Sequence, residues 1–416
     1  MSIKNEEDVK EIEIEKEDNF EKENNLEKEV QAERVVKNIH AQDSIRRRYR
    51  TIDLIMGIAV ISIVFSSGIG VVGELPAFLG FSKWNGITFG DLGLPLLLFC
   101  ICFLIPSEIE FDLKKKKSFK DIVLKKISIG IVLFLIGLVI NLIEAKNFNS
   151  FRIMGILQLI SIVYMICSLI YIVFRKFNFK TTVIATFLII IGLLGLVGYY
   201  FVGAKFGNNL NTCLAYFVDS KVMPGHFGDF ERYGIIATAS AMFYGCLAAA
   251  GGSFLCNRRV EERDKINRIL ILGMLFVIIA LLMEKSCPYN ANILSPSFMM
   301  IVLGGCFVVF SALFGVFDLN RSKFSNLLSF PFVVMGSSAV FVVGLNELIR
   351  NTLFSIKINS ISRGCWLGLD KWMVLDLFSD IFGSGSRTIG FIIIYLMIIF
   401  CMMLYLYAKR IFIRFK

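Results

Sequence analysis

The chain has 416 residues, of which 56% are hydrophobic and 19% charged, and it carries a formal net charge of +10. A soluble domain of this length does not bury so much apolar surface, so the composition indicates an integral membrane protein and excludes a soluble globular class. The lysines and arginines lie in short clusters beside apolar runs and not along one soluble face. We therefore expect membrane lipids as partners and no nucleic acid.

Residues 1–45 are rich in Glu, Lys and Asn and keep no sustained heptad of apolar residues. This composition is typical of a disordered or transiently helical tail, and a docking or self-association helix is the alternative. A homo-oligomer is therefore left open. No signal-peptide pattern precedes the first apolar run, so we expect the first membrane helix to direct insertion. The chain divides into a charged cytoplasmic tail, 1–45, and a membrane domain, 46–416.

The membrane domain contains ten apolar stretches. Each has about 20 residues, the length at which an α-helix crosses about 30 Å of hydrocarbon. They lack the alternation of transmembrane β-strands, so the sequence predicts an all-α, polytopic helical bundle of about ten transmembrane helices. The segment 351–386 is too polar to span and is expected to be amphipathic or re-entrant. The predicted spans are 50–72, 88–106, 123–144, 152–174, 181–203, 234–255, 266–283, 297–318, 326–349 and 388–408.

Basic residues divide unevenly between the two sets of loops that alternate along these spans. Counted from residue 46 onward, one set holds 25 lysines and arginines, and the other holds 12 that are spread over longer segments. Cytoplasmic loops carry the excess of basic residues, so the first set, which includes both ends of the chain, is assigned to the cytoplasm. We expect a multi-pass protein of the cell membrane with both termini cytoplasmic.

Polar side chains near the apolar runs are the first candidates for a functional site, because they are costly in a membrane unless they pair or line a cavity. Asp53 lies near the start of the first span, where the helix macrodipole also favours an acid. Asp91 follows Thr88 by three residues, so a helix capping box and a site role are equal alternatives. Four later residues are more typical of interhelical hydrogen-bond partners: Asn141, Gln158, Asn346 and Glu347.

Two histidines and ten cysteines complete the search for reactive groups. His226 lies in the loop before the sixth span and is a candidate for catalysis or binding, whereas His40 lies in the charged tail. Seven cysteines occur in or at the end of apolar runs without metal-ligand spacing, so no metal site is predicted. Three cysteines in the predicted external loops leave one disulfide open: Cys213, Cys287 and Cys365.

Several segments of the membrane domain match one known family in order and at compatible spacing. They are Arg-Thr-Ile-Asp at 50–53 with Gly57, Trp-Asn-Gly-Ile-Thr at 84–88 with Asp91, the run from arginine to glutamine at 152–158, and weaker matches at 234–252, 295–298 and 330–336. Together they cover roughly residues 46–410. On these segments the chain resembles the heparan-α-glucosaminide N-acetyltransferase family and its bacterial relatives.

The resemblance implies a membrane acyltransferase of ten or eleven helices. Such a protein takes acetyl-CoA, its donor substrate, from the cytoplasm and passes the acetyl group to an amine or hydroxyl of an extracytoplasmic sugar or glycan acceptor. The phosphates of acyl-CoA would meet basic cytoplasmic loops, with the lysines at 114–117 as candidates that also serve as orientation signals. The matching positions implied in binding substrate or acyl-CoA are Asp53, Trp84, Asn85, Arg152 and Gln158.

The sequence departs from the family where its catalytic histidine stands, three residues before the tryptophan, because this position is Phe81. Phenylalanine cannot accept a proton or an acyl group. Two hypotheses follow: an acyltransferase in which Asp91 or His226 accepts the proton, or a non-catalytic relative that acts as a glycan or lipid carrier, transporter-like protein or scaffold. Usual family residues are replaced at three further positions, Met56, Leu159 and Ser338.

Overall fold

The structure is a computed structural model that describes residues 49–67, 76, 78–145, 151–207, 209–226, 233–257, 260–319, 322–360 and 364–412. The predicted tail, 1–45, lies outside the described residues. Within the part that is described, regular structure is almost entirely helical, which confirms the predicted all-α class.

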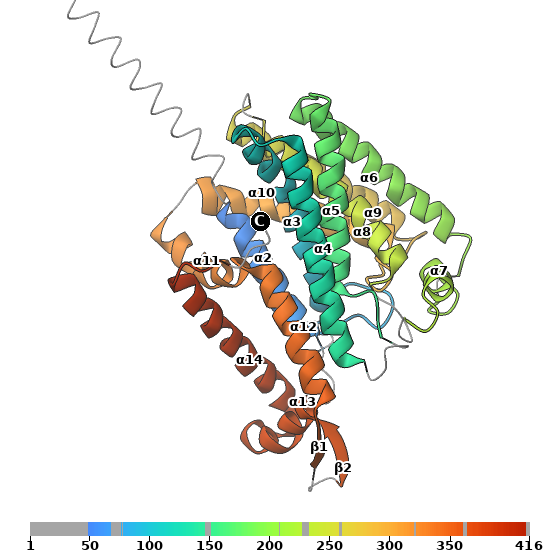
Figure 1. The fold of residues 1–416 in the computed structure, drawn as a ribbon, viewed down its shortest axis with the longest axis vertical. Helices are drawn as coiled ribbons and strands as arrows, with labels where there is room; N and C mark the ends of the chain where they lie inside the picture. The colour runs from blue at the N-terminus through green and yellow to red at the C-terminus, as the bar shows by residue number, and fades with distance from the viewer. Residues whose placement is uncertain are drawn as a thin grey trace, which may run out of the picture. The chain divides into compact units, whose positions relative to one another are not determined.

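Eight helices are long and apolar enough to cross a membrane (Figure 1). They are α3 (Phe89–Lys114), α4 (Phe119–Glu144), α5 (Ile156–Lys176), α6 (Thr181–Gly203), α8 (Ile235–Leu255), α9 (Glu262–Met283), α10 (Pro296–Phe314) and α14 (Ser379–Ala408). A π-helical turn, η2 (Gly315–Leu319), continues α10. These helices correspond to eight of the ten predicted spans.

The first and ninth predicted spans have a different form. Helix α2 (Arg50–Ser66) has 17 described residues, and the chain that follows it at 68–75 lies outside the described residues. The ninth span is divided into α11 (Lys323–Gly336) and α12 (Ala339–Ser355), which meet at an angle of 56° and together can form a ninth crossing. The break falls at Ser337 and Ser338, directly after a glycine.

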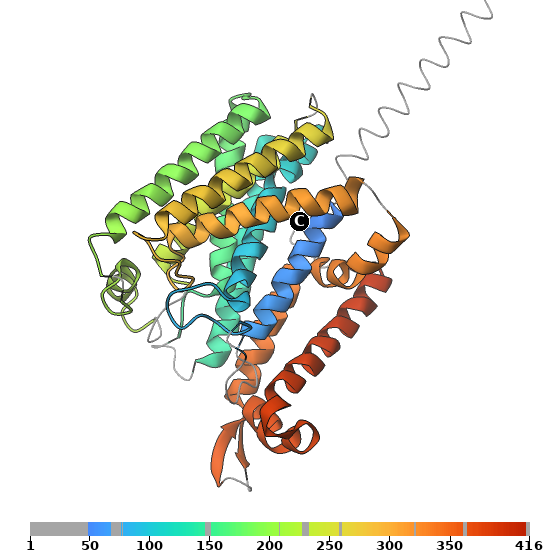
Figure 2. The ribbon, with the colours of Figure 1, turned by 180° about the vertical axis from the view of Figure 1, so that it is seen from behind.

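Close helix packing in the bundle depends on small residues. A Cβ atom on Gly336 of α11 would lie 1.9 Å from the carbonyl oxygen of Asp53 in α2, and one on Gly57 would lie 2.1 Å from the carbonyl oxygen of Phe332. Gly252 of α8 is pressed equally closely on the Phe103 carbonyl of α3. Figure 2 shows α9 and α10 side by side, where Gly304 lies against the backbone of α9. Glycine allows this backbone approach, as it does in many membrane proteins.

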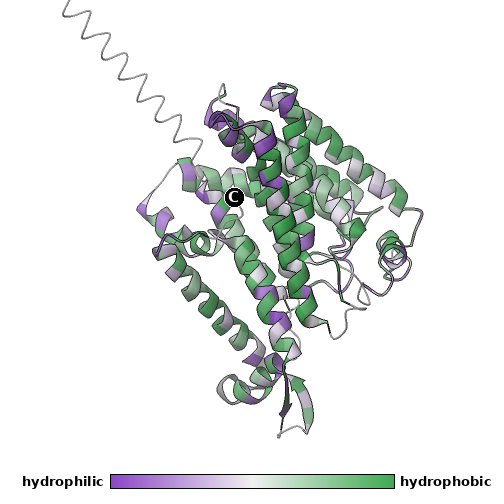
Figure 3. Ribbon diagram, viewed as in Figure 1, coloured by the Kyte–Doolittle hydropathy of each residue, from purple (hydrophilic) through white to green (hydrophobic). Residues whose placement is uncertain are grey.

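The outer helices expose apolar stripes along their length. Figure 3 shows that α6 and α14 are hydrophobic over most of their turns. Exposed residues recur at helical spacing on α4, at Leu124, Ile131, Leu135 and Val139, and on α6, at Phe187, Leu194 and Phe201. Such faces are stable only in an apolar solvent, which agrees with the membrane assignment.

The polar segment 351–386 differs from the single amphipathic or re-entrant segment that we predicted. It contains the end of α12 and an antiparallel hairpin of β1 (Lys357–Ser360) and β2 (Cys365–Gly368), with Lys357 opposite Gly368. The short helix α13 (Leu369–Trp372) and a π-helical turn, η3 (Met373–Leu377), then lead into α14. The strand β1 has only four residues, so a hydropathy pattern averaged over the whole segment does not reveal it.

Successive spanning helices run antiparallel, so their connections gather at two ends of the bundle (Figure 1). We call the end with the α3–α4 and α5–α6 turns the basic end. The opposite end, at which α3, α5, α8 and α10 begin, is called the loop end. Its described loops are 78–88, 151–155, 223–226 and 284–295, and a short helix, α7 (Leu214–Val222), precedes the third of them.

Candidate functional site

Asp91 closes the first turn of α3 at the loop end. Its side chain is 4% exposed, and its Oδ2 atom accepts hydrogen bonds from the backbone N–H of Ser82 (3.1 Å), the backbone N–H of Thr88 (3.1 Å) and the hydroxyl of Thr88 (2.7 Å). The Thr88 hydroxyl also lies 2.7 Å from the carbonyl oxygen of Gly80. The capping box allowed by the sequence spacing is therefore present, and it folds the loop back onto the helix.

Trp84 and Asn85 join this loop to the loop before α10. The carbonyl oxygen of Trp84 accepts a hydrogen bond from Asn292 (3.2 Å), and the Asn85 side chain accepts one from Asn290 (3.2 Å). Gly86, with a φ of 119°, donates its N–H to the Tyr289 carbonyl at 2.8 Å. Two segments about 200 residues apart are thus held together mainly through neutral amides, so the Trp-Asn-Gly motif has a structural role in this fold.

Arg152 and Gln158 lie beside a second pair of loops at the same end. The Arg152 carbonyl accepts a hydrogen bond from Asn141 of α4 at 3.0 Å, and its guanidinium lies over the Tyr233 ring at 5.6 Å. Gln158 is 1% exposed, and its amide nitrogen has no hydrogen-bond partner among the described residues. A buried donor of this kind is costly and is satisfied by a bound group or water more readily than by lipid.

His226 packs against the segment that leads to α5. Its Nδ1 atom lies 3.1 Å from the carbonyl oxygen of Phe151, and its own carbonyl accepts the N–H of Ile153 at 3.3 Å. A carbonyl oxygen can only accept, so Nδ1 carries a proton and donates this hydrogen bond. The ring is half-buried and stacks edge-on with Phe151. The ring is thus anchored through Nδ1, and a histidine held in this way is a candidate for an oriented general base.

The structure brings most of the predicted site residues to the loop end but separates Asp53 from them. Phe81 is 39% exposed in the loop that Asp91 holds. Asp53 lies instead in the first turn of α2, where it is 6% exposed and its carbonyl touches Gly336 of α11. The N-terminus of α2 is capped by Asp318, which accepts the N–H groups of the first two residues of α2 at 3.1 and 3.0 Å. Asp53 is therefore not a neighbour of the loop-end candidates.

Sequence reasoning missed a buried ion pair near the basic end. Lys126 of α4 is only 1% exposed, and its ammonium lies 2.5 Å from the Glu108 carboxylate of α3 and 2.7 Å from the hydroxyl of Tyr164 in α5. The sequence count treated Lys126 as one of many orientation charges. The signal in the sequence is a run of acids at every second position, Glu108, Glu110 and Asp112. This run ends one apolar span, and lysines begin the next.

The two other acids of this alternation are paired as well. Glu110 accepts a hydrogen bond from Arg175 at 2.6 Å and one from Tyr171 at 3.2 Å. Asp112 binds two lysines, Lys117 at 3.0 Å and Lys125 at 2.9 Å. The three acids of α3 thus connect α3 to both α4 and α5 at one end of the bundle.

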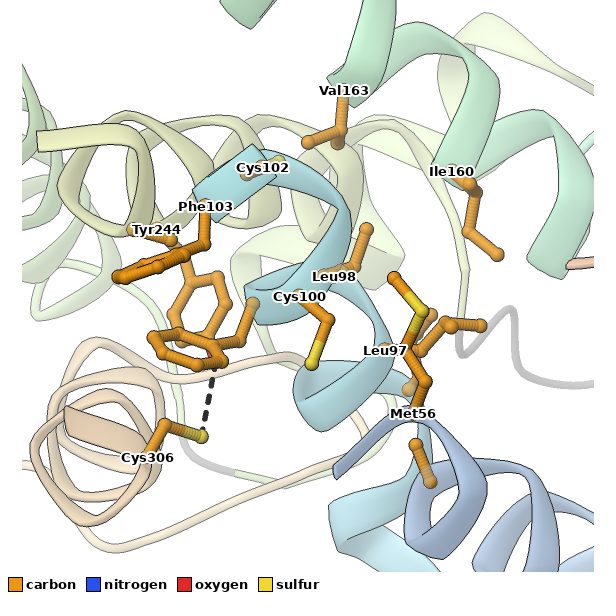
Figure 4. Close-up of a cluster of buried hydrophobic side chains, with 14 of the residues drawn as sticks. Met56, Leu97, Leu98, Cys100, Cys102, Phe103, Ile160, Val163, Tyr244 and Cys306 are labelled. Atoms are coloured by element: carbon orange, nitrogen blue, oxygen red, sulfur yellow. Dashed lines mark hydrogen bonds between the residues drawn. The ribbon is translucent and has the colours of Figure 1, made fainter. Parts of the chain in front are cut away.

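Apolar side chains and thiols fill the space between the two ends. Figure 4 shows Phe103 beside Tyr244 and Leu97 beside Met56, with the Tyr244 hydroxyl 3.9 Å from the Cys306 sulfur. All ten cysteines are free, so the disulfide left open by the sequence is not formed. Within the described residues, no group of three or more His, Cys, Asp or Glu side chains is arranged to hold a metal ion.

Comparison with known proteins gives no relative on which to base a role for these residues: no family model matches the chain, and no curated protein matches it. The candidate site therefore depends on its own geometry. That geometry consists of an oriented histidine, a buried amide and a capping aspartate at the loop end, and a separate set of ion pairs near the basic end.

Proposed function

We propose that the protein is a multi-pass membrane acyltransferase that transfers an acyl group from acyl-CoA to an amine or hydroxyl of a sugar or glycan. The observation that carries this proposal is the orientation of His226, because an anchored imidazole with a basic Nε2 can accept the proton of an attacking amine or hydroxyl. As the acceptor attacks the thioester carbonyl, the C–S bond breaks and the CoA thiolate leaves and takes up a proton. The resemblance of the sequence to membrane N-acetyltransferases supports the same reaction class.

The geometry favours His226 over Asp91 as the proton acceptor. One oxygen of Asp91 already accepts three hydrogen bonds that build the α3 cap, so this oxygen is occupied by a structural role. Phe81 contributes no base. In this proposal Gln158, whose buried amide nitrogen has no described partner, and Arg152 bind the acceptor or the acyl group.

The test is acyl-CoA binding and acyl transfer to amino sugars by purified protein, wild type against His226→Asn. Asparagine can place its amide nitrogen near the position of Nδ1 and keep the anchor to Phe151, but it has no base. We expect acyl transfer to fall by about 100-fold or more while thermal stability is retained. The matched control is His40→Gln, which removes the other histidine and should leave the rate unchanged. An unmodified protein that neither binds acyl-CoA nor transfers acyl groups would exclude the enzyme.

A non-catalytic carrier or transporter-like protein is the second candidate, and two observations favour it. The α11–α12 crossing is broken by 56°, and discontinuous helices often form substrate sites in transporters. Ionisable pairs inside a membrane bundle, such as Lys126 with Glu108, also often mark a transport path. Movement of a labelled glycan or lipid across proteoliposomes without acyl transfer would favour this candidate.

The orientation in the membrane belongs to the same proposal. We infer that the basic end faces the cytoplasm, with both chain termini on that side of the cell membrane, because the short connections there belong to the set with 25 basic residues. Reporters placed after Cys256 and after Asp318 should be cytoplasmic, whereas reporters near Asn209 and Lys357 should be external. A cytoplasmic reporter at Asn209 would reverse the assignment.

A further inference from the structure

The turn between α3 and α4 carries positive charge that no carboxylate of the described residues neutralises. Four exposed lysines lie in or beside it, and none has a carboxylate partner within ion-pair distance among the described residues. One exposed acid, Asp121, lies nearby, so the excess remains positive. The four lysines are Lys114, Lys115, Lys116 and Lys120.

The turn is held in shape from beneath by Asp112. This acid is 4% exposed, accepts hydrogen bonds from Lys117 at 3.0 Å and Lys125 at 2.9 Å, and accepts the N–H of Lys117 on its backbone carbonyl at 3.3 Å. Lys116 occupies the left-handed region with a φ of 57°, which reverses the chain. The buried acid thus neutralises two lysines and fixes the turn that presents the others.

The α5–α6 turn extends this surface. Arg175 is bound to Glu110 of α3 at 2.6 Å, which places the end of α5 beside the end of α3. The turn that follows exposes Lys176 and Lys180 together with Phe177, whose side chain is 69% exposed. Phe177 and Phe179 form an aromatic pair with ring centroids 6.4 Å apart. Surfaces that combine lysines with exposed apolar residues such as phenylalanine are typical of the boundary between headgroups and acyl chains.

Exposed lysines lie at the ends of the exposed apolar stripes of α4 and α6. On α4 the exposed face begins at Lys120 and continues through Leu124, Ile131 and Leu135 to Val139. The distance from residue 120 to residue 139 along the helix is ~28 Å, close to the thickness of a hydrocarbon core. On α6, Lys180 similarly precedes the stripe that contains Phe187 and Leu194. The side chains that can bind phosphate therefore border the acyl-chain region.

We propose that these two turns, 114–120 and 176–180, form a docking surface for the phosphate groups of anionic phospholipids. Lysines bind phosphate through charge-assisted hydrogen bonds, while Phe177 and the stripes of α4 and α6 contact the acyl chains. A free phosphate compound such as CoA satisfies only the first of these contacts, so the surface is assigned to lipid. The proposal does not depend on acyl transfer. It assigns to lipid the lysine cluster at 114–117, which the resemblance implies as a candidate site for CoA phosphates.

The experiment is lipid retention by the full chain, measured by native mass spectrometry after exchange into mixed phosphatidylglycerol and phosphatidylcholine. The test variant replaces Lys114, Lys115, Lys116 and Lys120 by glutamine, and we expect retention of phosphatidylglycerol to fall by about tenfold with phosphatidylcholine unchanged. A matched variant removes the same charge at the loop end, with glutamine at Lys83, Lys205, Lys221 and Lys285. It should retain phosphatidylglycerol at the wild-type level.

Two further measurements separate the source of phosphate and the contribution of the aromatic ring. Phe177→Ser should weaken retention of phosphatidylglycerol by a smaller factor of about threefold, since only an acyl-chain contact is lost. Soluble glycerophosphoglycerol and CoA are added as competitors. Displacement of the retained lipid by either one at equal concentration would overturn the lipid assignment in favour of a free phosphate ligand. Equal loss of phosphatidylglycerol in the two quadruple variants would overturn the proposed location.

Discussion

The two ends of the bundle are stabilised by different chemistry. Near the basic end, three acids of α3 pair with lysines of α4 and of the α3–α4 turn and with Arg175 of α5, and one of these lysines, Lys126, is almost fully buried. At the loop end, capping side chains and neutral asparagines bind loop backbone, as Asp91 does for α3 and Ser295 for α10. Ion pairs join α3 to α4 and α5 near the basic end, whereas neutral hydrogen bonds join the loops at the loop end.

The two ends are also assigned different functions in our proposals. The loop end holds His226, anchored through Nδ1, and the buried amide of Gln158, which the proposal assigns to an acceptor with hydroxyl or amine groups. The basic end offers fixed positive charge beside lipid-facing stripes, which is suited to phosphate. A core of buried apolar side chains, part of which Figure 4 shows, fills the bundle, so the proposed acyl transfer requires that this core opens or that a long donor reaches through it.

The largest effect is expected from Lys126→Met. The substitution keeps the apolar stem but leaves Glu108 and the Tyr164 hydroxyl without their cation, which should cost about 3 kcal/mol of unfolding free energy. The measurement is the unfolding transition of the protein in detergent or bicelles.

Two further variants show whether this loss arises from the broken pair. Lys120→Met removes an exposed charge on the same helix and should change stability by less than about 0.5 kcal/mol. Adding Glu108→Gln to Lys126→Met should recover part of the loss, because no uncompensated carboxylate remains. Equal destabilisation by the Lys126 and Lys120 variants would show that burial of the pair does not matter.

The second test measures how closely the helices pack between the two ends. It compares two neighbouring glycines of α10, one that contacts α9 and one that does not. A Cβ at Gly304 would lie 2.7 Å from the backbone nitrogen of Val277, whereas a Cβ at Gly305 would meet nothing within 4 Å. Gly304→Ala should destabilise the protein by about 2 kcal/mol through overpacking. Gly305→Ala should be neutral or stabilise by about 0.5 kcal/mol, because alanine favours the helix. Similar shifts in the two unfolding transitions would mean that α9 and α10 are not in close contact.

The third test addresses the cap at the loop end. Asp91→Ala removes three hydrogen bonds and should cost about 1.5 kcal/mol, less than the loss of Lys126 because no buried charge is left unpaired. Asp121→Ala, in the exposed first turn of α4, should cost only about 0.3 kcal/mol. Unfolding of both variants in the same detergent provides the measurement. If Asp91 is instead a proton acceptor for acyl transfer, the Asp91 variant will lose activity out of proportion to its stability.

Much of the fold could be predicted because spanning helices reveal themselves by length and apolarity alone. The cap at Asp91 was within reach, since Thr88 and Asp91 have the spacing of a capping box. The burial of Lys126 was not, because a count of basic residues gives the same weight to each lysine whatever it faces. The break between α11 and α12 was also missed, because apolarity continues through Ser337 and Ser338 while only the close contact of Gly336 with α2 marks the bend.

The last test concerns the two loops that meet at the loop end. Asn85 is exposed and accepts one hydrogen bond, from Asn290 at 3.2 Å, so Asn85→Ala should cost only about 0.5 kcal/mol. Asn290 is 2% exposed, and its side chain also accepts the N–H groups of Asn292 and Ile293, so Asn290→Ala should cost about 1.5 kcal/mol. Unfolding measurements on the two variants test these two expected losses of stability. The resemblance assigns Asn85 to substrate binding, and a residue with that role would lose acyl transfer while stability changes little. If acyl transfer by Asn85→Ala instead follows stability as it does in Asn290→Ala, Asn85 serves the loop contact alone.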